Sequence, residues 1–361
     1  MKMFPIRSDL VSLALTETAG ELSDVTFKLA DGREVQPMHT APWAAETLPS
    51  DVTPGLRMLR GDFFCAPFGD SDVLPDEKRS HGTTANGDWY AEILGESSMD
   101  AVLYGRVMSA AVTKHIELRP GHAVVYQRHT FAGGSGRLPV GHHAMLKAAS
   151  QLRLSFGPRI FAGTPPKPLE RPPAGRSILA YPQEITDLSA ARLADGGRID
   201  LTRYPVTDGH EDVWLVAADR TRPFGWTAAT SAEGGWVWFA LKDPRALPST
   251  LLWLSNGGRD YPPWSGRHRR VIGVEEICSY FHLGHAASIA ANPLSEMGIP
   301  TAVELRPDAP LVISYMFGLA AAPSDFGAVV DVRVAPGGVA LRSETGREVE
   351  AACDPSFVTG A

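Results

Sequence analysis

The chain has 361 residues, of which 44% are hydrophobic and 21% charged, a composition that is ordinary for a folded globular protein and argues against disorder. Its 34 Lys and Arg against 41 Asp and Glu give a net charge of −7, which excludes a broad nucleic-acid surface because such a surface needs a basic excess. No stretch approaches the roughly 18 uncharged apolar residues of a membrane span, so we expect neither a nucleic-acid nor a membrane partner.

Short segments typical of β-strands recur along the chain, and many of them alternate apolar with polar residues or are rich in Val, Phe, Tyr and Trp. Turn residues separate them, and the 35 Gly and 29 Pro exceed the usual share of these two residues. In chain order the predicted strands are Val25–Leu29, Ala101–Ser109, Lys114–Leu118, His122–His129, Leu152–Phe156, Val213–Ala217, Trp236–Leu241, Thr250–Leu254, Leu311–Met316 and Val329–Val334.

Helical candidates are few and short: Leu10–Thr16, the region around Met145–Leu152, and Ala286–Glu296. The predicted fold class is therefore all-β, a large antiparallel β-sandwich that spans residues 1–361 as one domain. The proline-rich segment Thr164–Arg176 is either a domain linker or, as we favour, a long surface connection within the sandwich. The extension from about Val329 either adds strands of its own or covers an edge of the sandwich.

The cysteine and histidine patterns do not predict a metal site. Cys65, Cys278 and Cys353 are an odd number without a CxxC pair, which indicates neither a disulfide framework nor a zinc site. His142 and His143 are neighbours, and neighbouring side chains of a strand point to opposite faces, so they cannot bind one metal together. The first twenty residues carry charges around only a short apolar piece, which is untypical of a signal peptide, and we expect a cytoplasmic protein.

Common catalytic motifs are absent from the sequence, but four segments place an ionisable side chain among apolar or aromatic residues. In the first, Arg60-Gly61 precedes two phenylalanines, and a buried guanidinium there needs a partner, for which a neighbouring aspartate is the structural alternative. In the second, His81-Gly82 is followed by Trp89, whose flat face suits the C–H surface of a sugar ring although such a pair is also common in turns.

The other two segments lie later in the chain. Pro139-Val140-Gly141 leads to His143, and Gly273-Val274-Glu275 ends in a carboxylate among Val, Ile and Cys. Such surroundings raise the pKa of a carboxyl group, which suits general acid or base catalysis, unless the strand alternates and Glu275 lies at an edge in water. Trp253 and Asn256, just upstream, add an aromatic face and an amide of the kind that carbohydrate sites use.

Taken in order, the four segments resemble the aldose 1-epimerase (galactose mutarotase-like) family. Members carry an Arg-Gly stretch followed by Pro and Gly, here Pro67 and Gly69, then a His-Gly with a Trp eight residues later. A second histidine follows a Pro-Val-Gly segment, and a Gly-Val-Glu comes late. The order and spacing of the four segments carry the resemblance, which covers about residues 20–320 and implies one large β-sandwich.

The resemblance implies a cofactor-free reaction that interconverts the anomers of a sugar. Glu275 would be the base at the anomeric hydroxyl and His143 the acid at the ring oxygen. Arg60 and His81 would hold the ring oxygen or neighbouring hydroxyls. Further contacts to the small-molecule sugar would come from an acid before the later strands and from the aromatic and amide side chains, namely Asp212 (with Glu211 as its rival), Trp89, Trp253 and Asn256.

Two departures bear on the substrate and on catalysis. Family members specific for hexose 6-phosphates have an arginine four residues after the first histidine, whereas this chain has Ala85, which favours a free sugar. Glu275 is followed by Glu276 in place of the frequent proline, and that second carboxylate either perturbs Glu275 or faces away.

Three functions remain open at this point. The leading one is an isomerase of the aldose 1-epimerase type. The second is a non-catalytic carbohydrate-binding or regulatory protein on the same fold, because a fold does not determine a function. Hydrolase or lyase chemistry ranks last, because a hydrolase needs two carboxylates flanking one bond and only Glu275 has a positional argument. The sequence leaves open which sugar binds and how many copies assemble.

Overall fold

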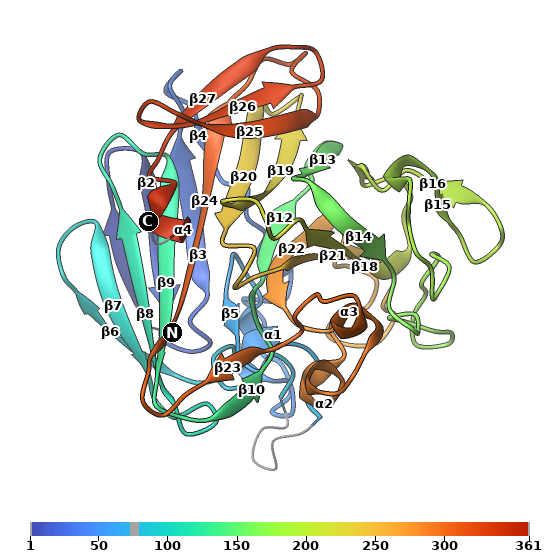
Figure 1. Ribbon diagram of the computed structural model, residues 1–361, viewed down its shortest axis with the longest axis horizontal. Coiled ribbons are helices and arrows are strands. Elements are labelled where there is room, and N and C mark those ends of the chain that lie inside the picture. The colour runs from blue at the N-terminus through green and yellow to red at the C-terminus, as the bar shows by residue number, and fades with distance from the viewer. Residues whose placement is uncertain (1, 73–78, 360–361) are drawn as a thin grey trace.

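Two large antiparallel sheets make up most of the protein, and the computed structural model describes residues 2–72 and 79–359 (Figure 1). The nine-stranded sheet has the order β17 (Arg203–Tyr204), β13 (Leu152–Phe156), β19 (Gly225–Ser231), β20 (Trp236–Lys242), β24 (Leu311–Ala321), β9 (Val124–Ala132), β8 (Ala111–Leu118), β7 (Ser98–Leu103) and β6 (Trp89–Ile93). The seven-stranded sheet has the order β14 (Arg159–Gly163), β18 (His210–Ala218), β21 (Ser249–Asn256), β22 (Val271–Cys278), β11 (Val140–His142) and β5 (Phe64–Cys65), and β12 (Ala144–Lys147) also pairs with β22. The predicted all-β fold class is confirmed.

Smaller elements surround these sheets. The first four strands form a sheet of their own, β1 (Met3–Arg7), β2 (Val11–Thr16), β3 (Leu22–Lys28) and β4 (Glu34–Val35). Two further pairs are β10 (Gly136–Leu138) with β23 (Val303–Leu305), and β15 (Ala191–Arg192) with β16 (Arg198–Ile199). The helices are short: α1 (Pro54–Met58), α2 (Gly284–Ile289), α3 (Pro293–Glu296), α4 (Ser356–Thr359) and the 3-10 turn η1 (Leu188–Ala190). No helix within the described residues is long and apolar enough to cross a membrane.

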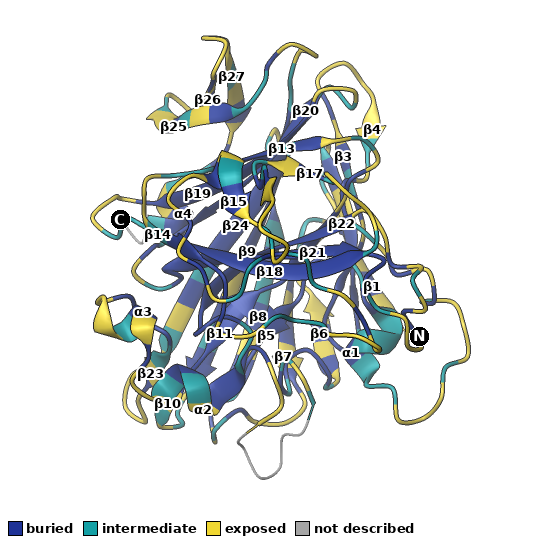
Figure 2. Cartoon of the chain, turned by 90° about the vertical axis from the view of Figure 1, so that its right-hand side faces the viewer, coloured by how far each residue is buried: buried dark blue, intermediate teal, exposed yellow. Residues whose placement is uncertain are grey.

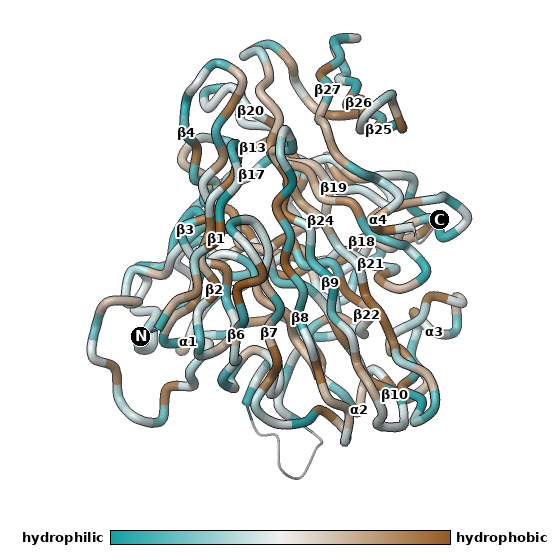
Figure 3. Tube along the Cα trace, turned by 90° about the vertical axis from the view of Figure 1, so that its left-hand side faces the viewer, coloured by the Kyte–Doolittle hydropathy of each residue, from teal (hydrophilic) through white to brown (hydrophobic). Residues whose placement is uncertain are grey.

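The central strands of the seven-stranded sheet are buried on both faces (Figure 2), and β21 and β22 contain no exposed residue. On one face, Ile272 and Val274 of β22 join the core between the two large sheets. On the other face, Val271 and Ile277 join a second hydrophobic cluster with Trp253. Because both faces of these strands are covered, their sequences are nearly continuous apolar runs. The strands β7 and β8 instead alternate buried residues with exposed or half-buried ones. Figure 3 shows the hydropathy of the residues along these strands.

Two of the three helical predictions are wrong. Segment Leu10–Thr16 holds strand β2, and the region around Met145–Leu152 holds the end of β12 and the start of β13. Short apolar runs do not separate helix from strand, and pairing with β3 and β22 decides these two cases. The third segment, Ala286–Glu296, is helical in two pieces, because Asn292 caps a new helix that begins at Pro293.

The C-terminal strands β25 (Val329–Ala335), β26 (Gly338–Ser343) and β27 (Glu348–Ala352) form a three-stranded sheet at one end of the molecule (Figure 1). Val332 and Leu341 of this sheet pack with Phe239 and Met316 of the nine-stranded sheet. The extension thus adds strands of its own that cover a face of that sheet. Residues 164–176 contain no helix or strand.

Candidate active site

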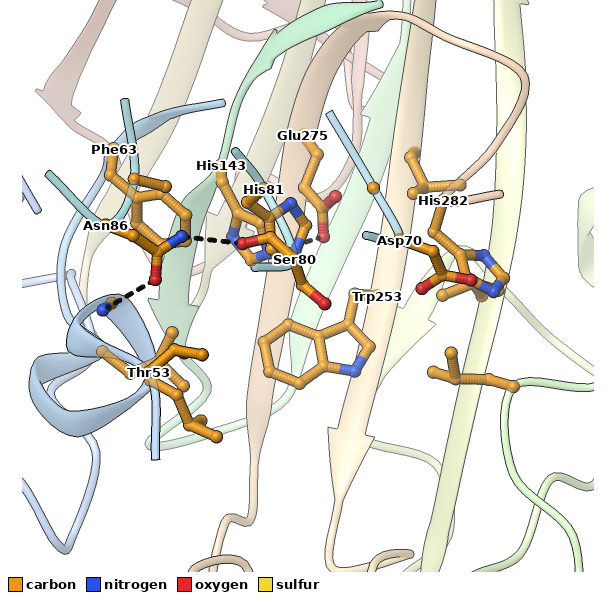
Figure 4. Close-up of a pocket in the computed structure, with 18 of the residues that line it drawn as sticks. Thr53, Phe63, Asp70, Ser80, His81, Asn86, His143, Trp253, Glu275 and His282 are labelled. Carbon is orange, nitrogen blue, oxygen red and sulfur yellow. Dashed lines mark hydrogen bonds and ion pairs between the residues drawn. The ribbon is translucent and has the colours of Figure 1, made fainter. Parts of the chain in front are cut away.

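A cavity of about 330 Å³ lies on the face of the seven-stranded sheet that points away from the nine-stranded sheet (Figure 4). Strands β18, β21 and β22 supply its floor through Val213, Leu251, Trp253 and Glu275. These residues occupy alternate positions of their strands, so they share one face of the sheet. The walls come from helix α1, from the loops that precede β5 and β6, and from the loops that follow β14, β21 and β22.

Glu275 and His143 meet in this cavity. The distance from His143 Nε2 to Glu275 Oε1 is 3.3 Å, and both side chains are almost fully buried. His143 lies between β11 and β12, the two short strands that pair with β22, and this pairing places it beside Glu275. The structure therefore brings together the two residues predicted to be catalytic.

Burial shifts the two groups in opposite directions. Removal from water raises the pKa of the Glu275 carboxyl well above its ordinary value. Removal from water also lowers the pKa of His143 well below its ordinary value, and the neighbouring His81 and Arg259 add to this effect. Burial therefore favours the uncharged form of both groups, in which the proton lies on Glu275 and the ring of His143 is neutral.

His81, the third predicted residue, also lines the cavity. Its ring is perpendicular to that of His143, with the ring centres 5.1 Å apart. Its backbone has φ +66°, in the left-handed region that non-glycine residues seldom adopt. Its N–H donates to the carbonyl of Gly69, and Asp70 N–H donates to the carbonyl of His282. These bonds join the His81 loop to the segment that follows β22.

Aromatic rings line much of the cavity. The Phe63 ring stacks on that of His143, with centres 4.6 Å apart and planes 15° from parallel. Trp253 and Trp264 meet edge to face, with centres 5.8 Å apart. Flat apolar faces beside polar groups are what the ring of a sugar requires.

Arg259 brings a guanidinium group to this aromatic wall. Its group lies 4.4 Å from the centre of the Trp264 ring and 5.5 Å from that of Trp253. Its Nε donates to Glu170 Oε1 over 2.7 Å and lies 3.9 Å from Glu211 Oε1. Glu211 also accepts a hydrogen bond from Trp253 Nε1 over 2.9 Å, and burial raises its pKa to about 6.

Asp70 and His282 line the cavity on the side away from Phe63 (Figure 4). Burial and the nearby Asp72 raise the pKa of Asp70. Burial and the positive charge of Arg259 lower the pKa of His282 to about 4. The three histidines that line the cavity are therefore neutral at pH 7, and Arg259 is its one permanent positive charge among the described lining residues.

Comparisons with models of known protein families and with curated proteins found no match. Solved structures do match. A protein from Escherichia coli K12 described as a "putative aldose 1-epimerase" superposes with a TM-score of 0.58 at 11% identity, covering 89% of this chain and 99% of its own. A galactose mutarotase-like protein from Lactobacillus casei ATCC 334 gives 0.54 at 15% identity, covering 88% and 100%. The chain has the galactose mutarotase-like fold.

Four of the predicted site residues lie elsewhere in this galactose mutarotase-like fold. Arg60 does not reach the cavity: its guanidinium donates to the carbonyl of Met58 and lies 3.9 Å from Glu21. It is held as a buried structural cation, with a glutamate instead of the expected aspartate as its partner. Asn256 donates to the carbonyl of Thr207 and so serves the backbone of a loop.

Asp212 and Trp89 also serve the structure and not the cavity. Asp212 accepts hydrogen bonds from Tyr181 and His210, whereas its rival Glu211 points to the opposite face of β18, toward Arg259. Trp89 is fully buried in the core, where its Nε1 donates to the carbonyl of Thr84.

Sequence reasoning assigned no role to Arg259, Asp70, His282 or Tyr261, which line the cavity. Their one signal in the sequence is composition, because Arg259 lies between Trp253 and Trp264 in a loop-like stretch. No group of three His, Cys, Asp or Glu side chains in the described part of the chain could hold a metal ion.

Proposed function

We propose that this cavity interconverts the α and β anomers of a free aldose by general acid and base catalysis. The observation that carries the proposal is the contact of His143 Nε2 with Glu275 Oε1 at 3.3 Å on the floor of a sugar-sized cavity. The fold, which solved aldose 1-epimerase-like proteins share, supports it as well.

The reaction needs one proton acceptor and one proton donor. Glu275 removes the proton of the anomeric hydroxyl while His143 gives a proton to the ring oxygen, so that the bond between C1 and the ring oxygen breaks and an open-chain aldehyde forms. After rotation about the C1–C2 bond, the two proton transfers run in reverse and the ring closes on the other carbonyl face. The sum of the steps leaves the enzyme unchanged and uses no cofactor.

This assignment requires the shared proton to be on His143 when the sugar reacts. Burial alone favours the form with the proton on Glu275. Transfer across the 3.3 Å contact gives the carboxylate and imidazolium pair, and hydroxyl groups of a bound sugar that donate to the carboxylate stabilise that form. A coupled pair with one proton can thus serve either direction of the reaction.

The lining also supports an uncharged sugar. Ala85 lines the cavity where hexose 6-phosphate enzymes of the resembled family have an arginine. Arg259, the cation that does line it, is already engaged by Glu170 and Glu211. The ring of a neutral sugar would lie against Trp253 and Trp264.

The proposal is tested by NMR exchange spectroscopy between the α and β anomers of a panel of aldoses. We expect the protein to accelerate exchange of at least one free sugar, and Glu275→Gln to lower the rate about 10²- to 10⁴-fold while sugar binding persists. Glu21→Gln is the matched control, because Glu21 is equally buried but outside the cavity. Saturable binding without acceleration would contradict catalysis and support a sugar-binding protein instead.

A further inference from the structure

Asp62 lies on the interior side of the seven-stranded sheet and is fully buried. Its carboxylate accepts three hydrogen bonds. Gln127 Nε2 donates to Oδ2 over 2.6 Å, and the backbone N–H of His143 donates to Oδ1 over 3.1 Å. His142 Nδ1 lies 3.1 Å from Oδ2, and because the carboxylate can only accept, Nδ1 carries the hydrogen.

Asp62 and Phe63 together hold two consecutive histidines. Asp62 fixes the ring of His142 and the backbone of His143. Phe63 stacks on the ring of His143, and its carbonyl oxygen shares the same backbone N–H over 2.9 Å. His142 is kept on the interior face, where its ring stacks on Tyr315. The imidazole of His143 is thereby directed into the cavity.

The path of the chain explains why an acid can reach this place. Gly61 has φ +57°, and a Cβ there would lie 1.7 Å from the carbonyl oxygen of Leu22. Beyond this turn, residues 61–63 run beside residues 143–145, because Met145 N–H donates to the carbonyl of Gly61. Asp62 is thus placed behind the backbone of His143, opposite the cavity.

We propose that Asp62 is a positioning residue that keeps the imidazole of His143 within reach of Glu275 and of the sugar. Asp62 does not line the cavity and does not touch the sugar. Its effect is on geometry, since small displacements of a catalytic group cost a large part of the rate. The activity readout of this inference rests on the proposed function, and a second readout does not.

Three variants test the inference by activity. In Asp62→Ala both the carboxylate and its bonds are lost, and we expect kcat to fall about 10- to 100-fold with KM within about threefold of the wild type. Asp62→Asn keeps an oxygen that can accept from the His143 N–H. Its new amide donates to Gln127, whose Oε1 has no partner and can turn toward it, and to His142 Nδ1, once the ring hydrogen moves to the unpartnered Nε2; we expect kcat within about fivefold of the wild type. Glu21→Ala, which removes another buried carboxylate away from His143, should lower the melting temperature and leave kcat unchanged.

The second readout is the side chain of His143, observed by NMR of the protein labelled with ¹⁵N-histidine. We expect its ring resonances to shift and broaden in Asp62→Ala but not in Glu21→Ala. Should Asp62→Ala fail to fold, Gln127→Met removes one donor from Asp62 and should shift the same resonances in a folded protein.

The outcomes separate this inference from the proposed function. In one outcome the wild type does not accelerate anomer exchange while Asp62→Ala still shifts the His143 resonances. That result would support the positioning role and overturn the catalytic function. If the wild type is active and Asp62→Ala has the same kcat and the same His143 resonances as Glu21→Ala, the positioning role is overturned. An Asp62→Asn variant as slow as Asp62→Ala would overturn it as well, because the charge and not the position would then matter.

Discussion

Glu275 and Glu276 are consecutive in β22, and their carboxyl groups lie on opposite faces of the sheet. Glu275 contacts His143 in the cavity, whereas Glu276 is bonded to Lys242 and to Thr250 between the two sheets. The ion pair with Lys242 compensates the charge of Glu276 in the interior. Burial raises the pKa of Glu275. The second carboxylate therefore anchors the strand and leaves the first one free for chemistry.

The pH dependence of the rate follows from the two shifted groups. In the proposed reaction the pair is active with one proton, and it gains a second proton when the pH falls below the lowered pKa of His143. It loses its only proton when the pH rises above the raised pKa of Glu275. We therefore expect kcat/KM to follow a bell that falls toward acid as His143 gains a proton and toward alkali as Glu275 loses its proton. The measurement is anomer exchange from pH 4 to 10, corrected for the rate without protein, and a single transition near pH 6.5 would contradict it.

Arg259 and Arg60 should have different roles. Arg259→Ala removes the guanidinium that lies over Trp264 and pairs with Glu170, so we expect KM for the sugar to rise about tenfold or more. Arg60→Ala leaves the buried Glu21 without its cation and should lower the free energy of unfolding by about 1–2 kcal/mol at unchanged KM. Steady-state kinetics and urea unfolding of both variants check this. An equal rise of KM in Arg60→Ala would place that residue back in the site.

The all-β class and the cavity residues Glu275, His143 and Trp253 could be predicted from the sequence, although two strands were predicted as helices. Glu275 and Trp253 lie on strands, where the alternation of side chains decides the face, and His143 lies between two short strands that pair with β22. The same periodicity explains one error, because Asp212 and Glu211 are adjacent and a choice between them reverses the face. Glu211 points toward Arg259, and Asp212 points away from it.

Loop residues could not be placed in this way. Arg259 follows β21 in a loop, and its approach to Glu170 joins segments that are 89 residues apart. Arg60 lies beside the left-handed turn at Gly61, and this turn directs it to Glu21. Neither path is encoded in a periodic pattern, because contacts between loops depend on the assembled sheets.

Gly273 makes room for the carboxyl group of Glu275. A Cβ at this position would lie 2.6 Å from Glu275 Oε1 and 3.0 Å from the Cβ of Trp253. In Gly273→Ala we therefore expect Glu275 to be displaced and kcat to fall at least tenfold. Gly95→Ala is the control, because a Cβ there meets nothing within 4 Å. Equal kcat values for the two variants would show that this glycine is not needed for the position of Glu275.

Half-buried, neutral histidines should make the protein sensitive to acid. Burial lowers the pKa of His39, His81 and His282 to about 4 each. The unfolded chain binds protons at these positions near pH 6.5, whereas the folded chain does not, so the free energy of unfolding falls as the pH drops from about 6.5 to about 4. Full titration of one such histidine corresponds to a loss on the order of 3 kcal/mol.

His39→Gln isolates this effect. His39 does not line the cavity, and its ring packs edge to face on that of His268, with the ring centres 4.7 Å apart. The buried carboxyl groups of Glu21 and Glu275 have raised pKa values, and their effect on the free energy of unfolding is opposite to that of the histidines. The folded chain keeps their protons at a pH where the unfolded chain has lost them. The comparison is therefore between variant and wild type in urea unfolding from pH 8 to pH 5. Their difference in the free energy of unfolding should be constant above pH 7.5 and should change below pH 6.5 in favour of the variant by up to about 1.4 kcal/mol per pH unit. Parallel curves over the whole range would mean that His39 takes up its proton in the folded protein.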